Sequence, residues 1–375
     1  MTAFSLVAIP IFVFLFAVRH QKQLLQWLSQ KLKGIHFSRN VSNPSDVKRM
    51  APYPAQPIKG RERYRVMMDI RKLDAQNWLT LDKNYMDEHR VRTQLLHEKR
   101  KEVLRCLPES IEPCQEALEE VSDFLCERFP NMFEMSIQDG RKIVDNRMTG
   151  DKFTVSGRDP NEGLTEALEA AVRLTMEDLS ILMMNEEGEF YLAASASLFP
   201  TGWTVNQRIG WTISQLHGPV PLWHQQVANS VSKFLARLTP TSPMERSNFF
   251  VEVKGPSENL TEILYRPGSL CEKELRSPLP SDILIRRERQ TFRRLPRTGA
   301  IVFGVKTYLT PLDELPMAEL DNLAKEMRSW PDYVGEYKGR DVWGAKVLEY
   351  YRQRVGESEK TGNEELNEKD ERIEV

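Results

Sequence analysis

Residues 282–312 read DILIRRERQTFRRLPRTGAIVFGVKTYLTPL, and this stretch decides the fold. It holds two runs rich in β-branched and aromatic residues, and they are joined across Leu295 to Gly299. A proline and a glycine in that junction favour a turn between two strands. We therefore predict that the stretch forms an antiparallel pair of strands.

A second hairpin is expected earlier in the chain. SILMMN (residues 180–185) and EFYLAASASLF (residues 189–199) are short apolar runs joined by Glu186-Glu187-Gly188. SNFFVEV (residues 247–253) reads as a fifth strand. Helical patterns lie between these strands, which predicts an α+β fold with an antiparallel sheet and flanking helices, not a doubly wound parallel sheet. The expected helices cover residues 82–107, 113–128, 161–178, 312–329 and 342–352, and one more begins near residue 221.

The overall composition is that of a globular protein and excludes some functions. The chain has 375 residues and a formal net charge of −2, so it has no general attraction for nucleic acid. Its four cysteines have neither the CxxC spacing of a zinc site nor the close spacing of an iron–sulfur cluster. Free thiols in a reducing compartment are the favoured interpretation, with disulfides as the alternative.

The N-terminus has the pattern of a membrane anchor. Residues 1–18 carry no charged side chain, and as a helix they span about 27 Å, enough for a thin bilayer. Positive charges begin at Arg19 and follow the apolar run, which favours an uncleaved single-pass helix with the remainder in the cytosol. The endoplasmic reticulum is the candidate membrane. The alternative is a cleaved secretion signal, which would expose the glycosylation sequons at Asn40 and Asn259.

Composition also sets the expected boundaries. We predict a transmembrane anchor at residues 1–20, an amphipathic and linker segment at 21–60, a folded domain at 61–354 and an acidic disordered tail at 355–375.

LFPTGWTVNQRIGWTISQLHGPVP (residues 198–221) is the most unusual segment of the expected domain. It combines turn-forming glycines and prolines with two tryptophans and His217 in apolar surroundings. A neutral imidazole in such a place needs a partner, either a backbone hydrogen bond or a metal. The residues alone favour the hydrogen-bonded core histidine, and aromatic side chains here are more often core than cofactor contacts.

Arginines are concentrated in the first strand of the opening stretch. Strand alternation places Arg287 and Arg289 on one face, and Arg286 and Glu288 on the other. Recognition of a small anion by a few arginines fits this pattern better than a nucleic-acid surface does. Ion pairs across the sheet are an equally good interpretation.

Four separated blocks of the chain together resemble a known family. They are RKLDAQNWLTLDKNYMDEHR (71–90), LFPTGW (198–203), LHGPVP (216–221) and RRERQTFRRLPRTGAIVFGVKTYLTPL (286–312). The family is that of the haem-dependent oxidative N-demethylase alpha subunit. The resemblance implies a PAS-like haem domain, with an antiparallel sheet and flanking helices around the porphyrin. It also implies oxidation of a small methylated amine, with release of formaldehyde.

The resemblance further implies roles for particular residues. His217 becomes the candidate proximal ligand of the haem iron, and Arg287 and Arg289 the candidates for binding the haem propionates. Phe199, Trp203 and Trp211 are expected to wall the pocket.

The chain lacks flavin, nucleotide and iron–sulfur motifs of its own. NADPH, flavin and a 2Fe–2S centre would therefore act through a separate reductase, which the membrane anchor suggests is membrane-bound. Whether the chain is an enzyme is left open by the sequence. A non-catalytic PAS-like sensor of haem or another ligand, or a degenerate binding protein, is the alternative to a mono-oxygenase.

Overall fold

The structure is a computed structural model that describes residues 46–156, 165–268 and 278–371. The expected anchor at residues 1–20 and most of the segment at 21–60 lie outside these ranges. None of the helices in the described ranges has the length and apolar character needed to cross a bilayer.

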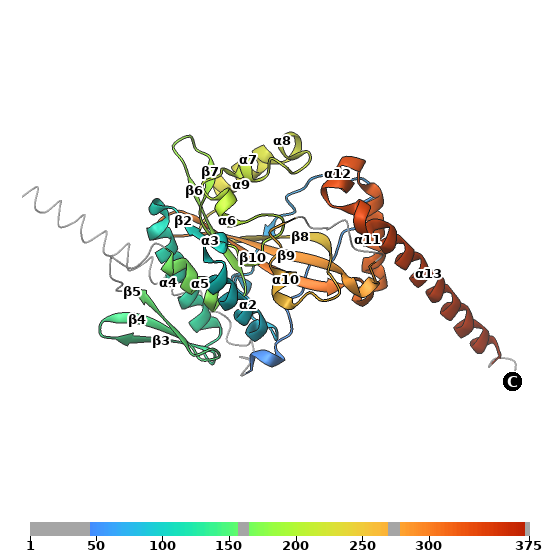
Figure 1. The fold of residues 1–375 in the computed structure, drawn as a ribbon, viewed down its shortest axis with the longest axis horizontal. Helices are drawn as coiled ribbons and strands as arrows, with labels where there is room; N and C mark the ends of the chain where they lie inside the picture. The colour runs from blue at the N-terminus through green and yellow to red at the C-terminus, as the bar shows by residue number, and fades with distance from the viewer. Residues whose placement is uncertain (1–45, 157–164, 269–277, 372–375) are drawn as a thin grey trace, which may run out of the picture. The chain divides into compact units, whose positions relative to one another are not determined.

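A seven-stranded sheet forms the centre of the described chain (Figure 1). Every neighbouring pair of its strands is antiparallel. In spatial order the strands are β1 (Arg71–Lys72), β8 (Met244–Val253), β9 (Ile283–Arg294), β10 (Ile301–Pro311), β6 (Asp178–Met184), β7 (Phe190–Ala196) and β2 (Leu104–Cys106).

The two predicted hairpins form the middle of this sheet. β9 and β10 pair from Ile301 opposite Arg294 to Pro311 opposite Leu284. The turn between them contains Gly299 at φ +74°, a conformation that glycine adopts without steric cost. β6 pairs with both β10 and β7. The predicted α+β class with an antiparallel sheet is confirmed.

Helices cover both faces of the sheet, on opposite sides of it in Figure 1. On one face, α4 (Ile111–Arg128) and α5 (Glu166–Leu174) pack against Ile181 and Val302 in the largest apolar core. On the other face, Leu235 of α9 packs against Ile301 in a smaller core. The shorter helices on this second face are α6 (Val205–Arg208), α7 (Ile213–Leu216) and α8 (Trp223–Gln226), before α9 (Ala228–Arg237).

A third group of helices packs at the far end of β8 and β9. Leu320 and Leu323 of α11 share an apolar core with Val251 and Ile285 of the two strands, and Trp343 completes it. The group consists of α11 (Met317–Ser329), α12 (Asp332–Tyr337) and α13 (Arg340–Glu371), and α10 (Leu260–Leu264) follows β8.

Some elements differ from the prediction. The helix expected at residues 82–107 is broken into α2 (Tyr85–Glu98) and α3 (Arg100–Val103), and it ends in β2, which pairs with β7. A separate three-stranded sheet, which lies outside the predicted elements, consists of β3 (Phe133–Gln138), β4 (Arg141–Asn146) and β5 (Asp151–Ser156). Within the expected acidic tail, α13 continues to Glu371, in a sequence rich in the good helix formers Glu and Lys.

Candidate functional site

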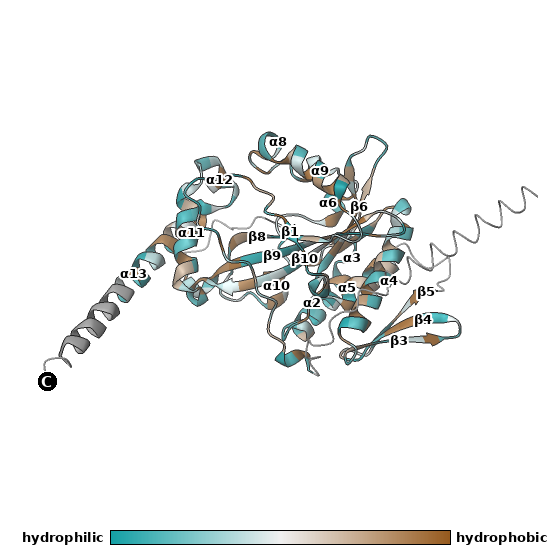
Figure 2. Cartoon of the chain, turned by 180° about the vertical axis from the view of Figure 1, so that it is seen from behind, coloured by the Kyte–Doolittle hydropathy of each residue, from teal (hydrophilic) through white to brown (hydrophobic). Residues whose placement is uncertain are grey.

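The two faces of the β8–β9 ladder carry different side chains. Arg246 lies opposite Gln290, and Met244 opposite Phe292, so these four side chains share one face. We call it the His217 face, because Ile213 and Leu216, on either side of His217 in the chain, pack in the same apolar core as Met244 and Phe292. Ser247 lies opposite Arg289 and marks the reverse face, which we call the arginine face. Figure 2 shows hydrophilic colour along the middle of β9, between its apolar residues.

His217 follows the last residue of α7, a short helix with a capping box. Thr212 accepts a hydrogen bond from the Gln215 backbone, and the Gln215 side chain accepts one from the Thr212 backbone. This cap begins the turn that leads to His217. Nδ1 of His217 then lies 2.9 Å from the carbonyl oxygen of Ile213, one helical turn earlier.

That contact settles the tautomer of the imidazole. A carbonyl oxygen only accepts, so Nδ1 must carry the hydrogen and donate it. In the neutral ring Nε2 then has a free lone pair, and no hydrogen bond to Nε2 is recorded among the described residues. A histidine that binds a metal through one nitrogen commonly donates from the other to a backbone carbonyl. The hydrogen-bonded core histidine and the metal ligand are therefore compatible here.

The surroundings of His217 keep the ring neutral and fixed. The pKa of His217 is lowered, first by burial and then by the charges of Arg246 and Arg208, while the Ile213 carbonyl opposes the shift. The ring is stacked on the Trp223 indole, with centroids 4.1 Å apart and 12° between the planes. A neutral imidazole with a fixed orientation is the form that binds a metal.

Two arginines near His217 form no ion pair among the described residues, although the charges of Glu288 and Asp69 oppose the effect of burial on the pKa of Arg246. Arg246 donates to the Gln290 side chain at 3.0 Å, while its buried Nε has no hydrogen-bond partner in the described part of the chain. The Arg208 guanidinium lies 5.1 Å from the centre of the Trp203 ring. Burial lowers the pKa of both arginines. A buried guanidinium with an unused donor is suited to an anion.

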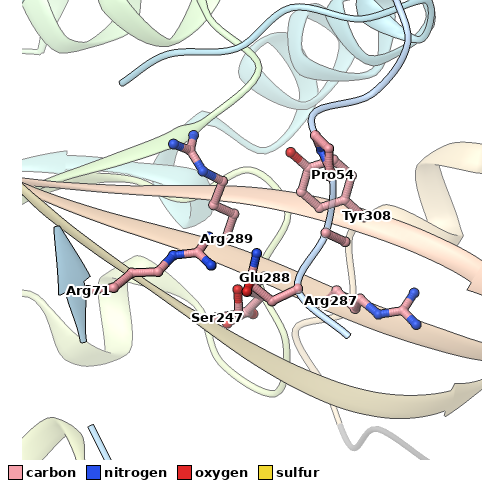
Figure 3. A pocket seen from close by; sticks show the side chains of 9 residues that line it. Pro54, Arg71, Ser247, Arg287, Glu288, Arg289 and Tyr308 are labelled. Atoms are coloured by element: carbon pink, nitrogen blue, oxygen red, sulfur yellow. The ribbon is translucent and has the colours of Figure 1, made fainter. Parts of the chain in front are cut away.

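Arg287 and Arg289 lie on the arginine face, and each already has an acidic partner. Arg287 pairs with Glu319 of α11 at 2.6 Å, and Arg289 pairs with Glu245 of β8 at 2.7 Å. Figure 3 shows the two guanidinium groups pointing apart. The cavity that they help to line measures about 10 Å³, enough for about one water molecule and far too small for a macrocycle. Arg287 and Arg289 share one face of β9, so the predicted alternation is confirmed. That face is the reverse of the His217 face, and the structure does not bring the two arginines to His217.

The three aromatic residues expected around the pocket lie in different places. Trp203 packs in the same apolar core as Ile213 and Leu216, beside His217. Phe199 is buried in the largest core, where the Arg92 guanidinium lies 4.2 Å from its ring centre. Trp211 is 41% exposed.

The sequence reasoning missed Arg246, Arg208 and Trp223. Arg246 lies one residue before the strand predicted at 247–253, and extending the alternation backwards would have placed it on the face of Asn248. The spacing of Ile213 and His217 was a further available signal, because residues four apart lie on the same side of a helix. Trp223 gave no such signal, since its position depends on the turn at Leu222, where φ is +64°.

The chemistry of the donor set fits a haem better than a protein-bound metal ion. Among the described residues there is no group of three or more His, Cys, Asp or Glu side chains placed to hold a metal ion. A porphyrin supplies four ligands itself and needs one axial imidazole. The ring of His217, oriented through Nδ1 and with no recorded partner at Nε2 among the described residues, has the chemistry of such a ligand.

A comparison with protein-family models gives one match across most of the chain. Residues 69–348 match the family described as "Haem-dependent oxidative N-demethylase, alpha subunit-like". The matched range includes the whole seven-stranded sheet, His217 and Arg246.

Proposed function

The chain belongs to the haem-dependent oxidative N-demethylase, alpha subunit-like family, and on that premise we propose that it is a haem-binding mono-oxygenase whose iron ligand is His217. One observation carries the proposal. Nδ1 of His217 donates to the Ile213 carbonyl, which leaves Nε2 as a lone-pair donor in a ring held against Trp223. A haem bound by His217 would supply oxidising chemistry that side chains lack.

Arg246 of the His217 face and Arg208 of α6 bind the propionates in this proposal. Arg246 has an unused donor at Nε, and Arg208 has no ion pair among the described residues. The roles expected for Arg287 and Arg289 would instead require them to release Glu319 and Glu245. Removing one partner of a buried pair costs about 3–5 kcal/mol, so Arg246 and Arg208 are the better candidates.

The apolar residues beside His217 exclude water in this proposal. Trp203 belongs to the pocket wall, next to Phe292 and Phe303, whose rings lie 4.9 Å apart between centroids. Trp211 contributes a partly exposed rim. The PAS-like form of the domain is part of the same proposal, supported by the family and by the antiparallel sheet with helices on its faces.

The reaction that we propose is oxidative N-demethylation of a small amine. Two electrons come from NADPH through a separate reductase that carries flavin and a 2Fe–2S centre. The methyl carbon leaves as formaldehyde, one oxygen atom of dioxygen enters the products, and the other becomes water.

The test uses the full chain in detergent, loaded with haem and mixed with a flavin and iron–sulfur reductase, NADPH and an N-methyl amine. Formaldehyde is measured against a sample without the amine. Formaldehyde that depends on both oxygen and the amine supports the proposed reaction. Haem binding without formaldehyde from a panel of secondary methylamines favours the sensor, and the absence of a Soret band after haem addition contradicts both haem functions.

We also propose that residues 1–20 anchor the domain to a membrane, with the endoplasmic reticulum as the candidate, and that the domain lies in the cytosol. The apolar run and the positive charges after it support this arrangement. Asn259 lies exposed at the start of α10, so a luminal domain would present it for glycosylation. Glycosylation at Asn259 in cells contradicts the cytosolic orientation, and its absence from a chain that fractionates with membranes supports it.

A further inference from the structure

Two thiols lie together at the edge of the main sheet, away from His217. Cys106 is the last residue of β2, the edge strand next to β7, and its side chain is half-buried. Cys114 lies in the first turn of α4 and is fully buried. Their sulfur atoms are 3.9 Å apart. From this geometry we propose that Cys106 and Cys114 form a dithiol that a hydroperoxide converts reversibly to a disulfide.

The surroundings assign different roles to the two sulfurs. The two sulfurs are in hydrogen-bond contact, in which either one can be the donor, and this contact is the main cause that lowers the pKa of Cys106. The Ser110 hydroxyl and the charge of Arg100 lower that pKa further, while burial opposes the shift. The pKa of Cys114 is raised, first by its contact with Cys106 and then by burial. The half-buried sulfur is therefore the thiolate that reacts first, and the buried one is the resolving thiol.

The chemistry takes place in two balanced steps. The Cys106 thiolate attacks one oxygen of the hydroperoxide, so that an S–O bond forms, the O–O bond breaks, and hydroxide or an alkoxide leaves. The Cys114 sulfur then attacks the sulfenic sulfur of Cys106, so that an S–S bond forms, the S–O bond breaks, and water leaves with the Cys114 proton. The two sulfurs together give two electrons to the peroxide. A thiol such as glutathione or dithiothreitol then reduces the Cys106–Cys114 bond by exchange, and is itself oxidised to a disulfide.

Cys126 of α4 is the matched control within the same helix. Burial is the main cause that raises its pKa, to about 11, and the nearby Asp123 and Glu134 add to the shift. It has no contact with another cysteine among the described residues. It is therefore expected to resist peroxide under conditions that oxidise Cys106.

The experiment titrates the free thiols of the full chain carrying Cys271→Ser, because Cys271 lies outside the described residues. Hydrogen peroxide is added, free thiols are counted with a chromogenic reagent, and peptides are mapped by mass spectrometry. The expected result is the loss of two of the three remaining thiols, with Cys106 joined to Cys114 and both thiols recovered on reduction. The same map on the unsubstituted chain checks that Cys271→Ser has no effect of its own.

Three variants complete the test. Cys114→Ala should leave a sulfenic acid at Cys106 that dimedone traps, Cys106→Ser should abolish the two-thiol loss, and Cys126→Ser should leave the Cys106–Cys114 bond forming at the parent rate. The proposal is overturned if no thiol is lost, if the joined pair includes Cys126, or if Cys106→Ser loses two thiols as fast as the parent. None of these readouts depends on haem, so this result is independent of the proposed oxygenase activity.

Discussion

Nδ1 of His217 lies 2.9 Å from the carbonyl oxygen of Ile213, and this one contact fixes which nitrogen of the ring is free. The other nitrogen, Nε2, keeps its lone pair in a ring that Trp223 holds by stacking. The contact depends on the capped turn of α7. A local feature of the sequence therefore orients the imidazole of the proposed haem site.

Loss of the stacking partner should disturb both stability and haem binding. Trp223 is 6% exposed, so Trp223→Ala is expected to lower the free energy of unfolding by about 3 kcal/mol, through the cavity that it leaves. It should also shift the Soret band, because the imidazole loses its orientation. Denaturant unfolding and absorption spectra measure the two effects. Trp211→Ala is the control, since that side chain is 41% exposed and its loss should change the free energy by less than about 0.5 kcal/mol.

Substitutions of arginines on opposite faces of the sheet should have opposite consequences. Arg246→Met is expected to weaken haem binding about tenfold, the equivalent of one charge-assisted hydrogen bond, with little change in the free energy of unfolding. Arg289→Met leaves Glu245 with only Arg71 as its ionic partner among the described residues. It should cost about 3 kcal/mol of stability while haem affinity changes little. Haem titration and denaturant unfolding distinguish the two arginines. If Arg289→Met loses more haem affinity than Arg246→Met, the propionates bind at Arg287 and Arg289, as the family resemblance implied, and the assignment to Arg246 is wrong.

The pH dependence of stability should report the buried imidazole. Because the pKa of His217 is lower in the folded chain than in the unfolded one, the unfolded chain binds the proton more readily as the pH falls. Stability from this group is therefore complete above about pH 6.5 and is lost on acidification below it. His217→Gln should flatten the decline in the free energy of unfolding between about pH 7.5 and about pH 5.5. Parallel curves for the variant and the parent contradict this expectation, and His224→Gln, an exposed histidine, should follow the parent.

Local patterns were enough to predict the two central hairpins of the sheet, but not α6 and α7, the short helices that precede His217. The β9–β10 and β6–β7 hairpins have turn residues between apolar runs, so their pairing was predictable from neighbouring residues. β2 was not, because residues 104–106 become a strand only by pairing with β7, about ninety residues later. The same limit applies to Arg287 and Arg289, whose alternation was predictable but whose partners Glu319 and Glu245 lie on other elements.

The most direct test of the central claim is the absorption spectrum of the haem-loaded full chain with His217→Gly, recorded before and after addition of imidazole. The account predicts that the substitution removes or shifts the Soret band, that free imidazole restores it by entering the vacated position, and that His224→Gly leaves the spectrum of the parent unchanged. A His217→Gly protein with the parent spectrum in the absence of imidazole would contradict His217 as the iron ligand.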